Sequence, residues 1–421
     1  MNTPPVDADA VEEAARALSG LVSQTPLQSN ARLSELHGTS VWLKREDLQP
    51  VRSYKLRGAL QLMSNLPRLD RTRGVVCASA GNHAQGVAFA CHQMAVKGRI
   101  YLPRNTPRQK RDRITAIGGS MVETVVFGDT YDEAAEMAAS DARHTGASIV
   151  PAFDHPATVA GNGTVAVEIV DQMLELTGYE PDVIVIPVGG GGLLAGCATW
   201  LRERHPDVQI AGVEPAGAAS MLAALEAGQT VSLESVDTFV DGAAVRRAGE
   251  VPFNLIQAAR VEIGTVDEGR VCTEMLDLYQ MDGIIAEPAG ALASASLGDT
   301  VLISPGQRVV CVLSGGNNDV SRYAEVVERA LIYSGRKFYF LVEFPQEPGA
   351  LRRFLDQVLG PDDDITLFEY VKRNNRETGP ALVGIEIAAP DDLEPLLRRM
   401  AQARLRIEPV PADSPLFRFL V

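Results

Sequence analysis

Lys55 is the residue of this chain whose type and setting are best suited to covalent chemistry. It lies in the stretch KREDLQPVRSYKLRGA, residues 44–59. A lysine becomes a good nucleophile when burial disfavours its ammonium form, and its neutral amine can then hold an aldehyde as a Schiff base. A lysine followed two residues later by an arginine is also common on solvated helices, so this interpretation depends on what else the chain provides.

Three motifs rich in small residues follow the lysine, and each comes directly after an apolar run that predicts a buried strand. The motifs are SAGNHAQG at residues 79–86, GGGGLLAG at residues 189–196 and SGGNN at residues 314–318. Glycines in such turns let backbone N–H groups approach a phosphate at a helix N-terminus, and a serine there can meet a ring nitrogen.

The body of the chain alternates apolar strand patterns with alanine-rich helical patterns. The expected strands cover residues 74–78, 99–102, 121–126, 183–188, 210–213 and 309–313. This alternation predicts an α/β fold, a parallel sheet with helices on both faces. Ligands of open parallel sheets bind beyond the carboxyl ends of the strands, and all three motifs lie there.

The lysine stretch and the three motifs, in this order, resemble the fold type II pyridoxal-phosphate enzymes, and among them the biosynthetic threonine dehydratases, or threonine ammonia-lyases. The resemblance extends from about residue 20 to the C-terminus. It implies pyridoxal 5'-phosphate as cofactor and a catalytic domain, residues 1–333, with two α/β lobes. The smaller lobe, near residues 56–155, is expected to be inserted in the larger one, with the cofactor between them.

A second domain is expected at residues 336–421, because the sequence pattern changes near residue 333. Its expected elements are a strand at 337–344, a helix at 350–359, strands at 365–373 and 381–387 joined by the turn 374–379, a helix at 393–403 and a strand at 406–410. This β-α-β-β-α-β order is the ferredoxin-like arrangement. It resembles the single ACT-like regulatory domain of short biosynthetic threonine dehydratases. The alternative is an oligomerisation module without a ligand.

The resemblance also implies roles for individual residues. Lys55 matches a Ser-aromatic-Lys signature and is expected to hold the cofactor, and then to remove the α-proton once an amino acid has displaced it. Asn82 is expected to hydrogen-bond the ring hydroxyl of the cofactor, and Ser314 to meet its pyridine nitrogen. Further expected contacts are Gly189, Gly190, Gly191, Gly192 and Leu193 with the phosphate, Gly242 and Glu287 in the cofactor pocket, and Ser79, Ala80, Gly81, Asn82 and His83 with the substrate carboxylate. The His83 ring itself is expected to be structural.

The implied reaction converts L-threonine to 2-oxobutanoate and ammonia, the first step of isoleucine biosynthesis, with L-serine as a slower substrate. Isoleucine is the expected feedback inhibitor, bound near the turn Glu347-Pro348-Gly349, and valine is expected to oppose it. Related serine racemases carry a second serine where this chain has Ala80, so racemisation is disfavoured. No acidic side chain follows Glu214 within residues 216–220, where racemases complete a divalent-cation site, so we expect no required metal.

Two alternatives stay open at this point, and a third fails on the spacing of its motif. One is another fold type II lyase that acts on serine or a substituted serine. Another is a non-catalytic amino-acid sensor, although a sensor needs neither the Schiff-base lysine nor a complete phosphate loop. The third is a nicotinamide dehydrogenase, but the spacing of Gly189–Gly192 departs from the dinucleotide-binding pattern, and Glu203 is only a loose match for its ribose-binding acid.

Composition limits the partners and the compartment. The 421 residues carry a formal net charge of −15, which opposes a nucleic-acid partner, because phosphate binding requires clustered cations. The one basic cluster, which we interpret as a solvated helix start beside the site, comprises Arg104, Arg108, Lys110, Arg111 and Arg113. The five cysteines show no C-x-x-C spacing, and no leader or membrane-spanning pattern occurs. We therefore expect a cytoplasmic homo-oligomer, a tetramer favoured, without a membrane partner.

Overall fold

The structure is a computed structural model of the chain, and it describes residues 6–371, 377–403, 405–411, 414–417 and 420. The chain divides into two compact units. The first contains residues 1–268 and 277–318, and the second contains residues 269–276 and 319–421. The predicted domain limits, 1–333 and 336–421, stay a prediction. No helix among the described residues is long and apolar enough to cross a membrane.

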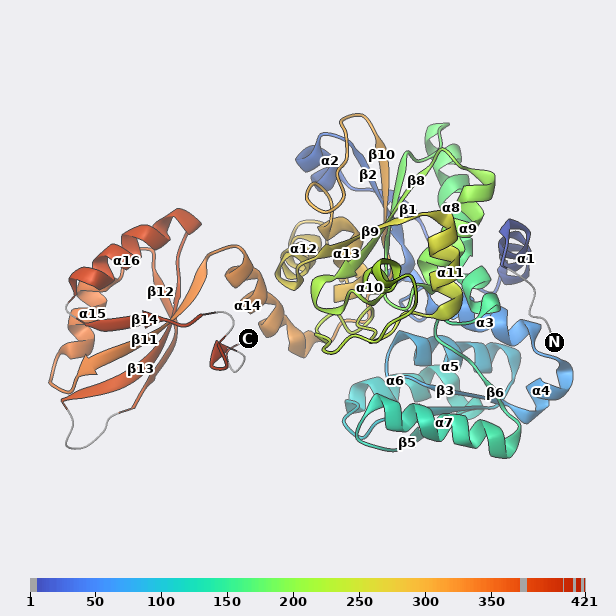
Figure 1. Cartoon of the computed structure of the whole chain (residues 1–421), viewed down its shortest axis with the longest axis horizontal. Helices are drawn as coiled ribbons and strands as arrows, with labels where there is room; N and C mark the ends of the chain where they lie inside the picture. The colour runs from blue at the N-terminus through green and yellow to red at the C-terminus, as the bar shows by residue number, and fades with distance from the viewer. Residues whose placement is uncertain (1–5, 372–376, 404, 412–413, 418–419, 421) are drawn as a thin grey trace. The chain divides into compact units, whose positions relative to one another are not determined.

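The first unit contains two sheets (Figure 1). The alternation of strands and helices in the sequence predicts a parallel sheet, but it cannot show whether the strands form one sheet or two. The larger sheet has the strand order β1-β2-β10-β7-β8-β9. Its strands are β1 (Leu27–Ser29), β2 (Ser40–Arg45), β7 (Val183–Pro187), β8 (Gln209–Pro215), β9 (Glu262–Val266) and β10 (Arg308–Leu313). Neighbouring strands are parallel except β1, which pairs antiparallel with β2. β7 is buried along its whole length, as a central parallel strand must be.

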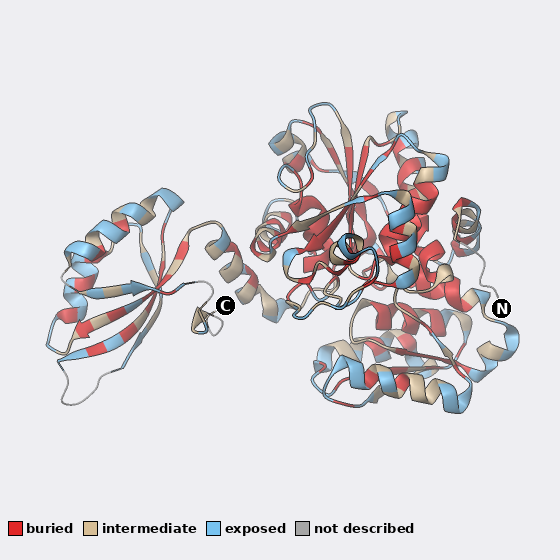
Figure 2. Ribbon diagram, in the orientation of Figure 1, coloured by how far each residue is buried: buried red, intermediate tan, exposed pale blue. Residues whose placement is uncertain are grey.

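Helices cover both faces of the larger sheet, with α8 and α9 on one side and α13 on the other (Figure 1). The helices of this region are α1 (Ala8–Leu18), α2 (Ala31–His37), η1 (Glu46–Leu48), α8 (Pro156–Thr177), α9 (Gly192–Arg204), η3 (Ala216–Ala218), α10 (Ser220–Ala227), α11 (Glu250–Ala259) and α13 (Pro288–Ala295). Most of α12 (Glu268–Gln280) belongs to the second unit. α9 is buried from Gly192 to Leu201, as Figure 2 shows, because its sequence is apolar on every face.

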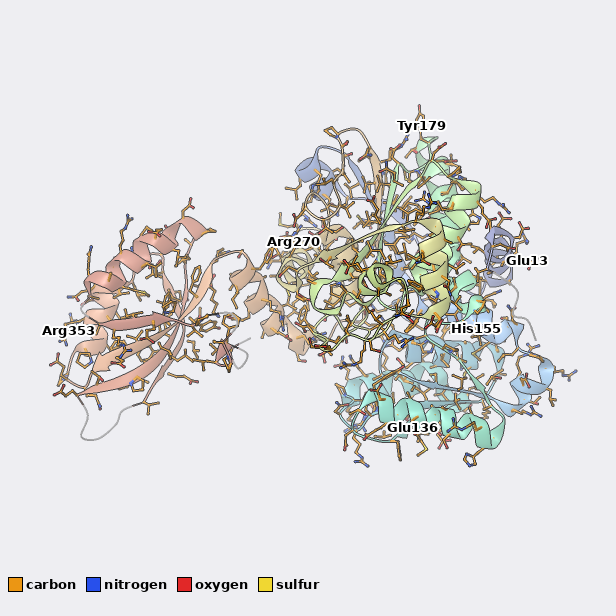
Figure 3. The ribbon with its side chains drawn as sticks, viewed as in Figure 1. Glu13, Glu136, His155, Tyr179, Arg270 and Arg353 are labelled. Carbon is orange, nitrogen blue, oxygen red and sulfur yellow. The ribbon has the colours of Figure 1, made fainter. Side chains whose placement is uncertain are left out.

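Helix α8 illustrates how local sequence sets the ends of these elements. It begins after His155, labelled in Figure 3, whose Nδ1 accepts a hydrogen bond from the N–H of Ala157 at 3.1 Å. Pro156 occupies the first helical position, where its missing N–H costs nothing. The helix ends at Gly178, which adopts the left-handed conformation common after helices.

The smaller sheet of the first unit has the order β5-β4-β3-β6, and all its strands are parallel. Its strands are β3 (Val75–Ala78), β4 (Gly98–Leu102), β5 (Val122–Val126) and β6 (Ser148–Ile149). Its helices are α3 (Lys55–Asn65), α4 (Arg68–Arg73), α5 (Asn82–Met94), α6 (Arg108–Gly118), η2 (Gly119–Met121) and α7 (Tyr131–Thr145). One face of α3, with Leu56, Leu60 and Met63, joins the apolar core of this lobe. Helix α3 also packs against α8 of the larger lobe, where a Cβ atom at Gly161 would lie 2.7 Å from the carbonyl of Arg57, so it contacts both lobes.

The second unit contains a four-stranded antiparallel sheet with the order β12-β13-β11-β14. Its elements are η4 (Val320–Arg322), α14 (Tyr323–Tyr333), β11 (Lys337–Pro345), α15 (Ala350–Val358), β12 (Asp364–Tyr370), β13 (Thr378–Glu386), η5 (Pro390–Asp392), α16 (Leu393–Gln402) and β14 (Arg406–Pro409). The predicted ferredoxin-like order is confirmed from β11 to β14. Part of the predicted turn 374–379 lies outside the described residues.

Candidate active site

The segment that carries Lys55 lies alongside the loop that follows β10. Lys55 is the first residue of α3. Two residues earlier, Ser53 forms an antiparallel bridge with Gly315, and the N–H of Tyr54 donates to the carbonyl of Ser314 at 3.2 Å. Backbone hydrogen bonds therefore join the lysine motif and the serine motif, which are about 260 residues apart in the sequence.

A chain of amide and carboxyl groups connects three further positions. Asn82 Nδ2 donates to Glu287 Oε1 at 2.6 Å, and Asn317 Nδ2 donates to Asn82 Oδ1 at 2.7 Å. The N–H of Asn317 donates to Glu287 Oε2 at 3.2 Å. Residues at the ends of β3 and β10 and at the start of α13 thus meet at one point, as the positions of the motifs beyond the strands predicted.

The carboxyl group of Glu287 is the most strongly perturbed acid of this cluster. Burial raises its pKa to about 7, and the nearby Asp241 carboxylate acts in the same direction. The donors Asn82 and Asn317 and the Lys55 amine act against this rise. Glu287 is therefore partly protonated near neutral pH, so it can accept and also donate hydrogen bonds in the pocket.

The glycine loop connects the end of β7 to the start of α9, and it has no room for side chains. A Cβ atom at Gly190 would lie 2.3 Å from Cγ of Phe153, and one at Gly189 would lie 2.9 Å from the Cα of Ala243. The N–H of Ala195 makes the first bond of α9, to the carbonyl of Gly191 at 2.9 Å. The backbone N–H groups before it point out of the helix end, where they can bind an anion.

Gly242 and Ser314 complete the group of residues that meet here. A Cβ atom at Gly242 would lie 3.4 Å from Glu287 Oε1 and 3.9 Å from Asn82 Nδ2. The buried hydroxyl of Ser314 donates to the carbonyl of Ala289 at 3.2 Å. The side chain of Leu193 lies in the apolar core of the larger lobe, so only its backbone is directed to the loop.

The loop 79–83 lies between β3 and α5. The N–H of Gly81 donates to Ser79 Oγ at 3.2 Å, and a side chain at Gly81 would meet only open space. His83 Nε2 is 2.7 Å from the carbonyl of Val150, and burial lowers the pKa of this histidine to about 4. A neutral His83 ring therefore donates to a backbone carbonyl and is held away from open solvent.

The basic cluster of α6 is only partly the solvated helix start that its sequence indicated. Arg104 and Arg108 are exposed. Lys110 Nζ, in contrast, lies 3.0 Å from Asp241 Oδ2, next to Gly242, and Arg113 Nε donates to Gln85 Oε1 at 2.9 Å. A cation of the smaller lobe thus contacts a segment of the larger lobe at the edge of the candidate site.

Sequence reasoning missed two residues of this site. Phe153, which lies against Gly190, stands in a segment with no periodic pattern, so nothing in the sequence marks it. Asn317 was part of the SGGNN motif but had no assigned role. Its two side-chain donor contacts, with Asn82 and with the carbonyl of Val51, link residues from different motifs.

Glu214, where racemases have a cation site, serves here as a helix cap. Its Oε1 and Oε2 accept from the N–H groups of Met221 and Leu222, each at 2.8 Å, in the first turn of α10. Burial raises the pKa of Glu214 to about 7. That no metal is required stays a prediction.

This raised pKa predicts how stability depends on pH. An acid whose pKa is higher in the folded than in the unfolded chain stabilises most below pH 4.5, and this contribution is lost as pH rises through about 7. We expect Glu214→Gln to remove up to about 3 kcal/mol of the fall in unfolding free energy between pH 4 and pH 8. Denaturant unfolding at several pH values measures this fall, with the half-exposed Glu203→Gln as control. An unchanged pH slope in Glu214→Gln would contradict it.

Two protein-family models match the chain. The pyridoxal-phosphate dependent enzyme family matches residues 18–315, and the C-terminal regulatory domain of threonine dehydratase matches residues 328–420. A biosynthetic L-threonine dehydratase of Mycobacterium leprae is 57% identical over 421 residues, which cover 100% of this chain and 97% of the relative. One of Corynebacterium glutamicum is 52% identical over 412 residues, with coverages of 97% and 94%.

Two solved structures with similar folds agree with the match to threonine dehydratases. The processed form of threonine deaminase isoform 2 from Solanum lycopersicum aligns with a TM-score of 0.71 at 37% identity, over 78% of this chain and 96% of its own. Maize serine racemase aligns with a TM-score of 0.70 at 26% identity, over 78% and 99%.

The fold, the lysine segment and the matched family define a pyridoxal-phosphate-dependent enzyme of fold type II. Within that class, the chain belongs to the biosynthetic L-threonine dehydratases. The predicted family, fold class, ammonia-lyase class and cofactor are thereby confirmed.

The described residues fit pyridoxal phosphate. The loop Gly189–Gly192 packs so closely against Ala243, Phe153 and Met221 that it has no room for side chains, and the N–H groups of the helix start beside it suit a phosphate. Two buried oxygens beside the lysine segment, Ser53 Oγ and Asn317 Oδ1, have no hydrogen-bond partner among the described residues. Buried polar atoms of this kind are normally satisfied, so they indicate a polar ligand at this place.

Proposed function

We propose that this protein eliminates the β-hydroxyl of L-threonine and deaminates it to 2-oxobutanoate and ammonia, the first step of isoleucine biosynthesis, with L-serine as a slower substrate. The observation that carries the proposal is the meeting of Lys55, Asn82, Glu287 and Ser314 at the carboxyl ends of two sheets, in a chain that matches threonine dehydratases over its full length. Atoms balance because the elimination releases water and 2-aminocrotonate, which takes up water again as it loses ammonia.

The amine of Lys55 takes two roles in this proposal. It forms the covalent bond to the cofactor aldehyde, and after the substrate amine has displaced it, it removes the proton from Cα. Bound pyridoxal phosphate makes this proton acidic by drawing electrons from Cα into its ring. The two roles require that the amine return to one position above the same carbon, so the start of α3 must be rigid.

The neighbouring residues bind and orient the ligands in this proposal. The N–H groups of Gly189–Gly192 and Leu193 hold the phosphate at the start of α9, and Gly242 leaves room for the ring. Asn82 would hydrogen-bond the ring hydroxyl, Glu287 would lie near the ring, and Ser314 would meet the ring nitrogen. Backbone groups of the loop from Ser79 through Ala80 and Gly81 to His83 hold the substrate carboxylate, which fixes the direction of the Cα–H bond.

The competing functions are another lyase for serine or substituted serines, and an amino-acid sensor. Steady-state turnover of L-threonine, L-serine and O-acetyl-L-serine, measured in parallel on the full-length enzyme, separates them. We expect the highest kcat/KM for threonine. A clear preference for O-acetylserine would favour the other lyase, and binding of amino acids without turnover would favour the sensor.

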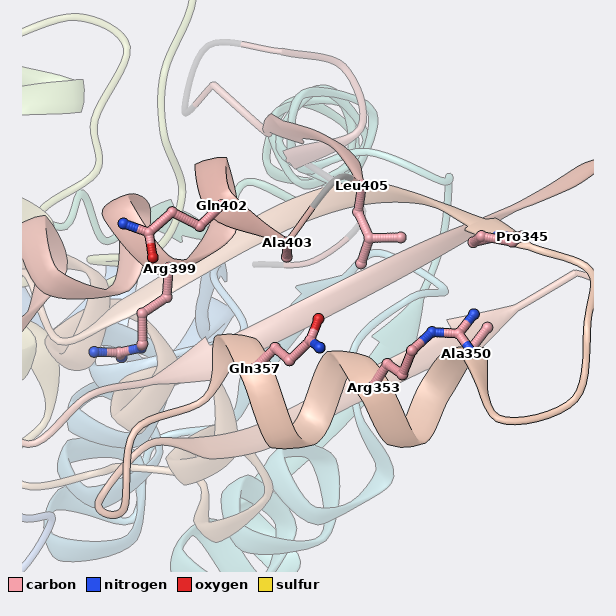
Figure 4. A pocket seen from close by; sticks show the side chains of 8 residues that line it. All are labelled: Pro345, Ala350, Arg353, Gln357, Arg399, Gln402, Ala403 and Leu405. Carbon is pink, nitrogen blue, oxygen red and sulfur yellow. The ribbon is translucent and has the colours of Figure 1, made fainter.

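The second unit contains a cavity that suits a free amino acid, the class of effector that we propose for this domain. It has a volume of about 600 Å³ and lies between α15 and α16 (Figure 4). Its lining residues are Pro345, Ala350, Arg353, Gln357, Arg399, Gln402, Ala403 and Leu405. Arg353 and Arg399 are each paired with a carboxylate of the domain, Glu347 and Asp363, so an effector carboxylate would share these cations. Two amides can accept from an ammonium group, and the remaining residues are apolar.

The turn that the sequence indicated for effector binding borders this cavity. The turn Glu347-Pro348-Gly349 lies between two of its lining residues, Pro345 and Ala350. We propose that isoleucine binds here and inhibits the enzyme, and that valine competes with it and opposes the inhibition. We also propose that the enzyme works in the cytoplasm as a homo-oligomer, with a tetramer favoured.

Filling the cavity is expected to remove feedback inhibition. Ala403→Trp places an indole in the cavity, so the half-inhibitory isoleucine concentration rises about tenfold or more, within the 5- to 150-fold range of typical allosteric coupling. Turnover without isoleucine stays unchanged. The matched control is Ala401→Trp, which changes an exposed alanine in the last turn of α16, two residues before Ala403 and outside the cavity. Equal isoleucine inhibition in both variants would place the effector elsewhere.

A further inference from the structure

Four charged residues lie in the interior of the first unit, close to Lys55, and the proposed reaction gives them no role. Lys44 and Glu46 are 0% exposed, and Arg57 is 1% exposed. Glu168, on α8, retains 17% side-chain exposure. Isolated buried charges are strongly unfavourable, so each must be paired and hydrogen-bonded. The two cations and two carboxylates sum to zero charge.

Arg57 uses all five of its N–H donors. Nε and Nη2 donate to the two oxygens of Glu46 at 2.9 and 2.8 Å. Nη1 and Nη2 donate to the two oxygens of Glu168 at 2.7 and 2.9 Å, and Nη1 also donates to Thr164 Oγ1 at 3.1 Å. Only the planar fork of an arginine can bind two carboxylates in this way, because a lysine has three donors on one atom.

Lys44 extends the same network. Its Nζ donates to Glu168 Oε2 at 2.6 Å, to Gln172 Oε1 at 2.9 Å and to the carbonyl of Thr25 at 2.7 Å. Glu46 Oε1 also accepts from the hydroxyl of Thr25 at 2.5 Å. The network therefore joins the end of β2, η1 and α8 to one residue of α3, which is Arg57.

The first turn of α3 depends on contacts with other elements of the unit. Tyr54, at its N-cap position, makes no side-chain capping bond. Two neighbouring helices instead approach its backbone where they have glycine. A Cβ atom at Gly86 of α5 would lie 3.0 Å from the carbonyl of Lys55, and one at Gly161 of α8 would lie 2.7 Å from the carbonyl of Arg57. An uncapped helix start without these contacts would fray.

We propose that Arg57 is a positioning residue for the amine of Lys55, acting through this buried network. The inference rests on the proposed function, in which Lys55 both holds the cofactor and removes the α-proton. The lysine side chain is flexible, so the network can locate its amine only by fixing the backbone from which it extends. A misplacement of about 1 Å at a reacting group can cost about a hundredfold in rate.

The test compares two conservative substitutions in the full-length holoenzyme. We expect Arg57→Lys to lower kcat for threonine by about 10- to 100-fold while KM changes by less than about threefold. We also expect bound pyridoxal phosphate to be released about fivefold faster or more to an added reagent that captures its aldehyde group. The reason is that Lys55, which holds the cofactor, is less well positioned. The matched control is Arg45→Lys. Arg45 is also buried and bidentate, with Asp47 at 2.9 and 2.8 Å, but it lies at the end of β2, and this pair includes no residue of α3.

The outcomes separate positioning from stability alone. If Arg57→Lys and Arg45→Lys lower Tm alike but both keep kcat and cofactor release within about twofold of the parent enzyme, measured well below Tm, Arg57 is only structural and the proposal is overturned. Should Arg57→Lys fail to fold, Glu168→Gln at the partly exposed edge of the network must show the same two changes. If the parent enzyme does not turn over threonine, the proposed function fails, and the rate of cofactor release still tests the role of Arg57.

Discussion

Lys55→Ala is expected to lower threonine turnover by about a thousandfold or more. The substitution removes the amine that holds the cofactor and also the base that removes the α-proton, and Lys110, at the edge of the site, is paired with Asp241. The measurement is the initial rate of 2-oxobutanoate formation by enzyme saturated with pyridoxal phosphate. The visible absorbance of the covalently held cofactor is expected to disappear with the activity.

Lys97→Ala is the matched control for this substitution. Lys97 belongs to the smaller lobe, and its Nζ donates to the carbonyl of Ser120 at the surface, at 2.7 Å. We expect it to keep the turnover of the parent enzyme. Turnover of Lys55→Ala within tenfold of the parent would show that another group performs the chemistry.

Gly190→Ala is expected to produce the second-largest effect, a loss of cofactor affinity. The added methyl group would lie 2.3 Å from the Phe153 ring, so either the ring or the loop must move. Overpacking of this kind costs about 1–3 kcal/mol, which corresponds to about a 5- to 150-fold weaker cofactor if the loop moves. Titration of the apoenzyme with pyridoxal phosphate gives the Kd directly.

Gly178→Ala controls for the loss of a glycine. Gly178 has a positive φ of 78° and no atom within 4 Å of a Cβ at that position, so alanine brings strain but no collision. It should cost about 1 kcal/mol of unfolding free energy and leave the cofactor Kd unchanged. A parent-like Kd in Gly190→Ala would mean that this loop does not shape the phosphate site.

The parts of the fold that the sequence predicted are those with strong local patterns. The runs that became β3, β7 and β10 are continuous and apolar, so both their existence and the motifs at their ends could be located. β1 and β6 could not, because they have three and two residues and mostly exposed or half-exposed side chains. Their pairing depends on neighbours that are distant in the sequence.

In the candidate site, too, the features with local sequence patterns could be predicted, and those that depend on distant contacts could not. Its motifs could be found one by one, and the family resemblance supplied a role for each. The contact between Asn82 and Glu287 joins residues 205 positions apart, and no local pattern encodes it. The spacing of Lys55 and Arg57 is common on solvated helices, and the burial of Lys44 and Arg57 becomes visible only when Glu46 and Glu168 are placed beside them.

The most direct test of the account is a product analysis of the purified full-length enzyme with pyridoxal phosphate and L-threonine. We predict that each threonine consumed yields one 2-oxobutanoate and one ammonia, without D-allo-threonine, the product of inversion at Cα. Threonine that stays unconsumed in the presence of bound cofactor, or that is converted mainly to another stereoisomer, would contradict the account.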